Sequence, residues 1–263
     1  MALRTLAESG VALDEPRYLD AATSTARYLL TQMRRADGRL MRSWRAGSTS
    51  NPGFCDDYGA LALGLFSLYQ ATGEPEWFVA ASDITAEMID LFWDDDAGAF
   101  HATGRDVERL IARPKNLLDN PTPSDNALAV EALQHLAAFT GDADHLARID
   151  RVFLSAAPLI DRHPMGLGQM LSVLLVSLEP PVELAIVGDG PARSALESVV
   201  RRTYRPHVFV AIGDGAQDHG VPLLQDRRSG SGAAAYVCRG FVCLAPVESP
   251  RQLAAALDQS RPA

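Results

Sequence analysis

Apolar side chains recur at three- and four-residue steps through the first two thirds of the chain. After Pro16, for example, Tyr18, Ala22, Leu29 and Met33 follow this spacing. The period places apolar side chains on one face of an α-helix. Glycine, aspartate and proline interrupt the pattern at intervals and are typical of helix ends and turns. The sequence therefore predicts amphipathic helices over residues 16–33, 60–71, 78–91, 124–140, 143–160 and 165–178.

A short internal repeat connects two pairs of these helices. Leu68–Glu74 matches Leu136–Asp142 in spacing and residue type, and an aromatic residue or a histidine follows each copy, at Trp77 and His145. A Thr-Gly-acid turn that recurs between successive helices is typical of stacked helical hairpins. We therefore expect hairpins that lie side by side, with the loops of one face lining a common pocket.

The pattern changes after Pro181, where short apolar runs replace the helical spacing. Residues 182–187 and 207–212 are typical of strands, and residues 191–202 between them have a helical pattern. A strand, a helix and a strand in this order predict a βαβ unit with parallel strands. Shorter elements are also expected, with strands over 99–101, 234–237 and 241–244 and a final helix over 250–259.

These patterns together predict a mainly α protein with two unlike parts. Helical hairpins occupy residues 1–180, and a small α/β lobe occupies residues 181–263. A chain of 263 residues is long enough for one large domain, or for one medium and one small domain.

Composition and charge exclude several classes of partner. The formal net charge of −9 argues against nucleic acid or an anionic membrane surface as a non-specific partner. No apolar run reaches the length that a bilayer requires, and acidic residues follow the N-terminus at once, unlike in a signal peptide. The three cysteines do not form a disulfide framework in a chain of this length. We expect a cytoplasmic protein with reduced thiols.

Two polar stretches precede apolar helices and are the strongest candidates for a binding site. The first lies between Arg42 and Tyr58, and the second between Arg113 and Asn126, where three prolines stiffen the backbone. One interpretation is that their charges cap helices and form salt bridges within loops. The other, which we favour, is that the two stretches meet in a pocket that binds a small molecule.

The second interpretation assigns roles to individual side chains. Asp57 and Asp56 could act as acid or base, with Lys115 as a clamp for an anion or a hydroxyl. Trp44 and Phe54 could stack on a ligand. Further ligand contacts are expected from Arg42, Arg45, Tyr58, Arg113, Asp119 and Asn126.

No cofactor or metal is expected from the sequence. The turn Gly188-Asp189-Gly190 follows a strand and precedes a helix, but it lacks the third glycine of a nucleotide-binding loop, and Asp189 would repel phosphate. The six histidines show no ligand spacing.

The cysteines leave two alternatives open. Cys238 and Cys243 are separated by four residues, rather than the two of a redox or zinc motif. We expect a half-buried pair of thiols, and the alternative is a labile disulfide. Cys55 lies beside two carboxylates, which disfavour its thiolate, so we expect it to pack rather than react.

Several ordered motifs resemble a known family. Gly38-Arg39-Leu40 is followed by Asp56-Asp57-Tyr58, then by Arg113-Pro114-Lys115 with Asp119, Ser124 and Asn126, and finally by the segment from Cys238 to Cys243. This series is similar to motifs of the spermatogenesis-associated, thioredoxin-domain family (YyaL-like proteins). The chain departs from the family pattern at Asp125, where the family has Gly, and at Gly59, where it has Ala.

The resemblance implies part of an (α/α)₆ toroid like that of N-acylglucosamine 2-epimerases and six-hairpin glycosidases. It implies a carbohydrate-like ligand and, for catalysis, epimerisation or glycoside hydrolysis with Asp57 as the base. The family's thioredoxin-like domain and first toroid hairpins have no counterpart here, so a separate chain would supply that half, or this chain would be an inactive fragment. The competing implication is a non-catalytic module that docks a thioredoxin-like partner near Cys238 and Cys243.

Overall fold

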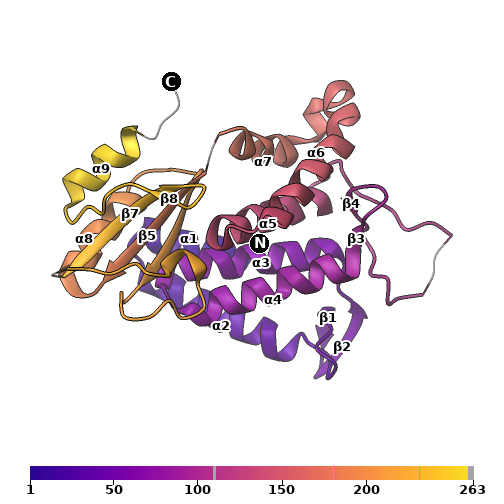
Figure 1. Ribbon diagram of the computed structural model, residues 1–263. Coiled ribbons are helices and arrows are strands. Elements are labelled where there is room, and N and C mark those ends of the chain that lie inside the picture. Colours follow the sequence, from indigo (N-terminus) through magenta and orange to yellow (C-terminus); the bar gives the residue numbers. More distant parts are fainter. Residues whose placement is uncertain (109–110, 180, 231, 260–263) are drawn as a thin grey trace.

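The computed structural model describes residues 1–108, 111–179, 181–230 and 232–259. It is mainly α-helical (Figure 1). The helices of the first part are α1 (Ala2–Ala12), α2 (Pro16–Gln32), α3 (Cys55–Thr72), α4 (Pro75–Phe92), α5 (Asp125–Thr140), α6 (Ala143–Arg162) and α7 (Gly168–Leu178). The six helices predicted from apolar spacing are confirmed, and α1 was not predicted. Within the described residues, no helix is long and apolar enough to cross a membrane.

The helices pack as successive hairpins. The pairs α1–α2, α3–α4 and α5–α6 are each formed by neighbours in sequence, and α1, α3, α5 and α7 also pack one against the next. Helices α3 and α5 therefore lie between other helices, and most of their residues are buried (Figure 1). Side-by-side hairpins are what the internal repeat predicted.

The repeated turn has the same structure in both copies. At the end of α3, Gly73 adopts a left-handed conformation (φ 73°) and its N–H donates to the Tyr69 carbonyl, which closes the helix. The Thr72 hydroxyl donates to the Leu68 carbonyl, and the Trp77 ring N–H donates to Glu74 at 2.8 Å. The equivalent residues after α5 are Thr140, Gly141, Asp142 and His145. Gly141 likewise donates to the Ala137 carbonyl and the Thr140 hydroxyl to the Leu136 carbonyl, so the matching spacing of the two copies reflects turn contacts that recur.

The second part is a four-stranded sheet with two helices. Its elements are β5 (Val182–Gly188), α8 (Gly190–Arg201), β6 (Val208–Gly213), β7 (Ala233–Arg239), β8 (Val242–Cys243) and α9 (Pro250–Gln259). The strand order is β6-β5-β7-β8, with β5 parallel to β6 and the other neighbours antiparallel. The predicted βαβ unit, its parallel strands and the final helix are confirmed.

The free edge of the sheet rests on the end of α3. The Val210 N–H of β6 donates to the Gln70 side-chain oxygen at 3.0 Å, and the Tyr69 hydroxyl donates to the Ile212 carbonyl at 3.4 Å. These bonds satisfy backbone groups that an edge strand otherwise leaves open to another chain. Phe209 adds an edge-on ring contact with half-buried His135 of α5. The lobe and the hairpins therefore share one buried cluster of apolar side chains.

Two short β-hairpins lie next to the α3–α4 pair in the chain, one before α3 and one after α4. The first, β1 (Met41–Arg45) with β2 (Ser48–Pro52), was not predicted, because most of its side chains are exposed and polar and give no alternating apolar pattern. The second joins β3 (Trp93–Asp94) to β4 (Ala99–Phe100), which confirms a strand at the position expected.

The expectation of reduced thiols is wrong for two of the three cysteines. Cys238 at the end of β7 lies opposite Cys243 of β8, and their sulfurs form a disulfide. The tight turn between the strands brings the two Cα atoms to 3.9 Å, and this pairing could not be known from the spacing of the cysteines alone. Cys55 is a buried free thiol, as predicted, and burial raises its pKa.

Helices α3 and α5 approach each other most closely at Gly59. A Cβ atom at this position would lie 2.9 Å from the Leu128 Cβ and 3.2 Å from the Leu128 carbonyl carbon. Glycine inside a helix costs about 1 kcal/mol relative to alanine. Close packing of the two backbones therefore accounts for glycine at this position.

We predict that Gly59→Ala destabilises the chain by about 1–3 kcal/mol, because the new Cβ forces two helix backbones apart. The matched control is Gly64→Ala in the same helix, where the nearest atoms belong to the Leu3 side chain, which can move. Urea unfolding of both variants measures the difference. Equal stability of the two variants would contradict a tight backbone contact at Gly59.

Candidate functional site

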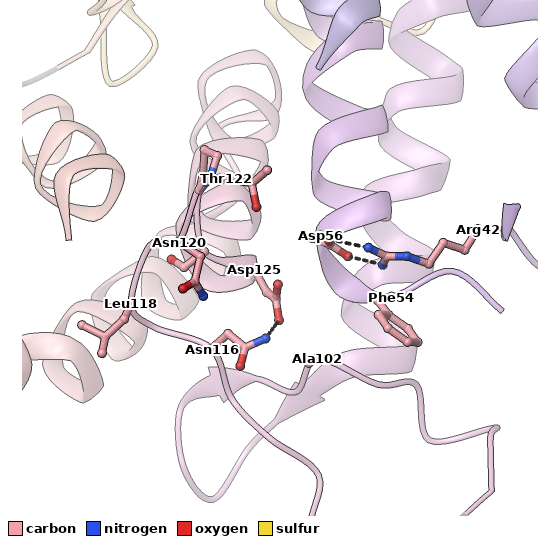
Figure 2. A pocket seen from close by; sticks show the side chains of 11 residues that line it. Arg42, Phe54, Asp56, Ala102, Asn116, Leu118, Asn120, Thr122 and Asp125 are labelled. Carbon is pink, nitrogen blue, oxygen red and sulfur yellow. Dashed lines mark hydrogen bonds and ion pairs between the residues drawn. The ribbon is translucent and has the colours of Figure 1, made fainter. Parts of the chain in front are cut away.

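A pocket of about 210 Å³ lies where the N-terminal ends of α3 and α5 meet (Figure 2). Both polar stretches contribute to its wall, so the structure brings them together as predicted. The lining residues are Arg42, Phe54, Asp56, Ala102, Asn116, Leu118, Asn120, Thr122, Pro123, Ser124 and Asp125.

One side of the pocket is formed by Asp56 and Arg42. The Arg42 guanidinium donates to both Asp56 carboxylate oxygens, at 3.0 and 3.4 Å, and stacks over the Phe54 ring with 4.6 Å from its central carbon to the ring centre. A guanidinium fork held by a carboxylate and an aromatic ring has little freedom to turn away. This side therefore presents a fixed ion pair and an aromatic ring.

The opposite side is formed by Asp125, at the start of α5. Its side chain is buried, with 7% of the residue exposed, and one carboxylate oxygen accepts a hydrogen bond from the Asn116 amide at 2.7 Å. Burial, followed by the nearby charge of Asp56, raises the pKa of Asp125 to about 6. Figure 2 shows the two side chains on neighbouring helices, with Asp125 directed toward Asn116 and Asp56 toward Arg42. Two carboxyl groups with different environments thus line one pocket.

In the sequence, Asp125 stands out only as a departure from the family pattern, and it is not among the predicted site residues. The available signal was its position directly after Ser124, which caps α5 by accepting the Ala127 N–H at 3.3 Å. A carboxylate at this position stands in the first turn of a helix that begins in a polar loop. Its burial, however, depends on the packing of α3 and could not be derived from the sequence.

Asp57 has the capping role that was the alternative interpretation. Its carboxylate accepts the Phe54 N–H at 2.8 Å at the start of α3, and a bond from Arg42 at 2.9 Å. Burial raises the pKa of Asp57. It is not among the lining residues of the pocket.

Tyr58 is fully buried and also lies outside the lining of the pocket. Its hydroxyl accepts bonds from the Arg39 guanidinium at 2.8 Å and from the Leu40 N–H at 3.1 Å. Burial raises its pKa. Tyr58 therefore anchors the segment before β1, while Arg45 is exposed at the end of β1 and away from the pocket.

Arg113 and Lys115 hold the second polar stretch against the β3–β4 hairpin. The Arg113 guanidinium donates to the Thr103 and Leu91 carbonyls, and burial lowers its pKa. Lys115 donates to Asp94 at 2.8 Å, and this bond lowers the pKa of Asp94 to about 2. The expected clamp cations are thus occupied within the protein and do not line the pocket.

Asp119 and Asn126 shape the same loop. Asp119 accepts the Ser124 N–H at 2.9 Å and the Gln169 N–H at 2.8 Å, which joins the loop to the first turn of α7. Asn126 is fully buried and exchanges two hydrogen bonds with the backbone of Phe100, at 2.7 and 3.0 Å. These two side chains fix the loop that carries Asn116, Asn120 and Thr122 into the pocket wall.

Within the part of the chain that the structure describes, no group of three or more His, Cys, Asp or Glu side chains could hold a metal ion. The pocket instead offers carboxyl, amide and hydroxyl groups, one guanidinium and one aromatic ring. Such a wall can accept and donate hydrogen bonds to a polar, uncharged ligand and can transfer a proton at Asp125 near neutral pH.

Comparison with known proteins adds relatives but no family assignment. No protein-family model matches this chain. Spermatogenesis-associated protein 20 of Homo sapiens is 30% identical to it over 264 residues, which cover 94% of this chain and 34% of that protein. The Mus musculus protein of the same name is 28% identical over 96% of this chain and 34% of its own length. An uncharacterized protein of Caenorhabditis elegans is 23% identical over 96% of this chain. The chain spans about a third of the length of these curated relatives.

We predict that Asp125→Asn stabilises the chain at pH 7. The pKa of Asp125 is about 6 in the folded chain and about 4 in an unfolded one, so its contribution to stability is present below pH 4 and lost as the pH rises to 6. An asparagine escapes that loss, which amounts to at most about 3 kcal/mol. Urea unfolding at pH 4 and pH 7 measures the effect.

The matched control is Asp150→Asn, an exposed carboxylate on α6. It should change stability little at either pH. If Asp125→Asn raises stability equally at pH 4 and pH 7, ionisation of Asp125 does not destabilise the folded chain.

Proposed function

We propose that the pocket between the starts of α3 and α5 binds a carbohydrate-like ligand and transfers a proton to or from it. The observation that carries this proposal is the buried carboxyl group of Asp125, with its raised pKa, opposite the ion-paired carboxylate of Asp56. A buried carboxylate lowers the stability of the folded chain, and groups that do so are found most often at functional sites.

The composition of the wall supports a sugar more than other small molecules. Carboxylates and side-chain amides can each bond two neighbouring hydroxyls, and the ring of Phe54 offers a face on which a sugar can stack. An anionic ligand would be repelled by Asp56 and Asp125, and an apolar ligand would leave the polar wall without partners. The volume is below that of drug-sized sites, which fits a single sugar ring rather than an oligosaccharide.

The two carboxyl groups suit acid–base chemistry. Asp125, with a pKa of about 6, can hold or release a proton near neutral pH, whereas Asp56 is paired with Arg42 and can stabilise positive charge on the substrate. Epimerisation and glycoside hydrolysis both need such a pair. In this proposal Asp125 replaces Asp57 as the group that moves the proton, because Asp57 caps α3.

The proposal extends to the architecture around the site. Helices α1, α3, α5 and α7 pack in sequence order, with α2, α4 and α6 paired to the first three, as inner and outer helices do in an (α/α)₆ toroid. The family resemblance supports the same arrangement. The curated relatives are about three times as long as this chain, so additional hairpins of a longer protein would complete the ring.

The proposal predicts that one class of neutral sugars or amino sugars binds the wild-type chain, as measured by thermal shift and calorimetry. Asp125→Asn should weaken that binding at least about tenfold while raising the melting temperature. Arg42→Ala should also weaken it, because Asp56 loses the cation that orients it.

The control variant is Lys115→Met, whose cation lies outside the pocket wall. It should retain the affinity of the wild type, even if the chain becomes less stable. If no sugar shifts the melting temperature, or if Lys115→Met loses as much affinity as Asp125→Asn, the proposed site is wrong.

A further inference from the structure

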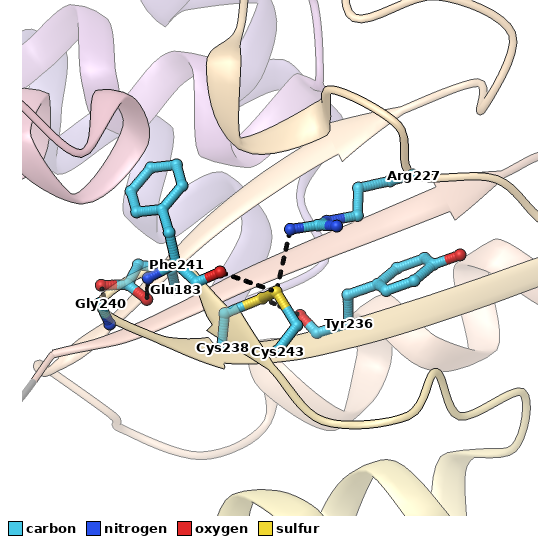
Figure 3. Close-up of a disulfide and its surroundings, with 7 residues drawn as sticks. All are labelled: Glu183, Arg227, Tyr236, Cys238, Gly240, Phe241 and Cys243. Carbon is cyan, nitrogen blue, oxygen red and sulfur yellow. Dashed lines mark hydrogen bonds between the residues drawn. A yellow bond between two sulfur atoms is a disulfide. The ribbon is translucent and has the colours of Figure 1, made fainter.

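The disulfide between Cys238 and Cys243 (Figure 3) joins a buried cysteine to a partly exposed one. Cys238 is 1% exposed and belongs to β7, which lies between β5 and β8 in the sheet. Cys243 is partly exposed on the edge strand β8, where Val242 and Leu244 on either side are 78% and 57% exposed. Cys243 is therefore the more exposed of the two cysteines and the one that we expect an incoming thiol to attack.

A cation lies beside the accessible sulfur. The Arg227 guanidinium is 2.9 Å from the Cys243 sulfur, and Figure 3 shows it above the strand pair that carries the disulfide. A disulfide that serves only as a staple needs no cation, whereas a thiolate is strongly favoured by one. The contact therefore points to chemistry at Cys243 in its reduced state.

The position of Arg227 is fixed by its surroundings. Its guanidinium stacks over the Tyr236 ring at 5.3 Å, and the Tyr236 hydroxyl bonds to the backbone N–H and carbonyl of Arg228, at 3.2 and 2.6 Å. Tyr236 belongs to β7, two residues before Cys238. The strand that carries one cysteine thus also holds the cation that faces the other.

The turn between the cysteines is also held in place. Gly240 and Phe241 both have positive φ angles, 55° and 63°, as in the tight turns that join antiparallel strands. Buried Glu183 of β5 accepts the N–H groups of both residues, at 3.1 and 3.2 Å. These bonds do not involve the sulfurs, so we expect the turn to keep its shape when the disulfide is reduced.

We propose that Cys238 and Cys243 form a thiol–disulfide exchange site that reacts with a dithiol. The dithiol's thiolate attacks the Cys243 sulfur, the disulfide breaks, and Cys238 leaves with the electron pair and takes up a proton. The second thiol of the dithiol is then deprotonated. Its thiolate attacks the first dithiol sulfur, which is bonded to Cys243 in the mixed disulfide, and releases Cys243 as a thiolate beside Arg227. The dithiol is oxidised to a disulfide, and the chain gains two electrons, which leaves Cys238 as a thiol and Cys243 as a thiolate.

The same steps in reverse oxidise the chain at the expense of a disulfide. The Cys243 thiolate is then the attacking group, and Cys238 resolves the mixed disulfide. This site is separate from the pocket at α3 and α5 and does not depend on the function proposed there.

Alkylation of the reduced chain tests the exchange site directly. The full chain carries Cys55→Ala to leave two thiols, is reduced with dithiothreitol without denaturant, and is then treated with iodoacetamide over a range of pH. We expect Cys243 to be alkylated at least about tenfold faster than Cys238, with a midpoint below the usual thiol value of about 8.5. Mass spectrometry of the peptides gives both rates.

Variants at Arg227 separate its role from folding. Arg227→Gln should move the midpoint for Cys243 to higher pH and slow its alkylation at pH 7 severalfold, whereas Arg227→Lys should stay near the wild type. A cooperative melt confirms that each variant is folded. In Cys238→Ser, one equivalent of a small aromatic disulfide should become trapped as a mixed disulfide on Cys243, while Cys243→Ser should trap almost none.

Three results would overturn the proposal. One is a disulfide that dithiothreitol reduces only after the chain is unfolded. Another is alkylation of the two thiols at equal rates. The third is a midpoint for Cys243 that is unchanged in Arg227→Gln. Each would identify the disulfide as a structural staple.

Discussion

The close contact of α3 and α5 at Gly59 is the constraint on which the candidate site depends. Asp56 stands three residues before Gly59, and Asp125 three residues before Leu128, the residue that Gly59 meets. The contact therefore places the first turns of the two helices side by side and brings two carboxyl groups to one pocket.

The electrostatics of the site follow from that arrangement. Helix N-termini favour negative charge, which suits both aspartates. Burial, followed by the nearby charge of Asp56, raises the pKa of Asp125. The hydrogen bond from Asn116 and the charge of Arg42, which is paired with Asp56, oppose this shift. The side chains predicted to clamp a ligand, such as Lys115 and Asp119, instead fix the loop around the pocket.

Elements with a local signature could be predicted from the sequence, and side-chain directions could not. The helices over 16–33 and 124–140 and the parallel strands after Pro181 follow from apolar spacing, which is a local property. Helix α1 was missed because its buried residues, Leu3, Ala7 and Gly10, include only one large apolar side chain. The convergence of the two polar stretches was predicted correctly. Asp56 and Asp57 are adjacent, however, and one helical step of about 100° separates a lining residue from a cap. That step is fixed by the packing of α3.

The most direct test of this account is the titration of Asp125 by carbon-detected NMR of its side-chain carboxyl group. We expect a midpoint near pH 6 in the wild type and a lower midpoint in Asp56→Asn, because one like charge is removed while burial remains. A midpoint near 4 in both proteins, the ordinary value for an aspartate, would show that the two carboxyl groups do not share a pocket and would contradict the proposed site.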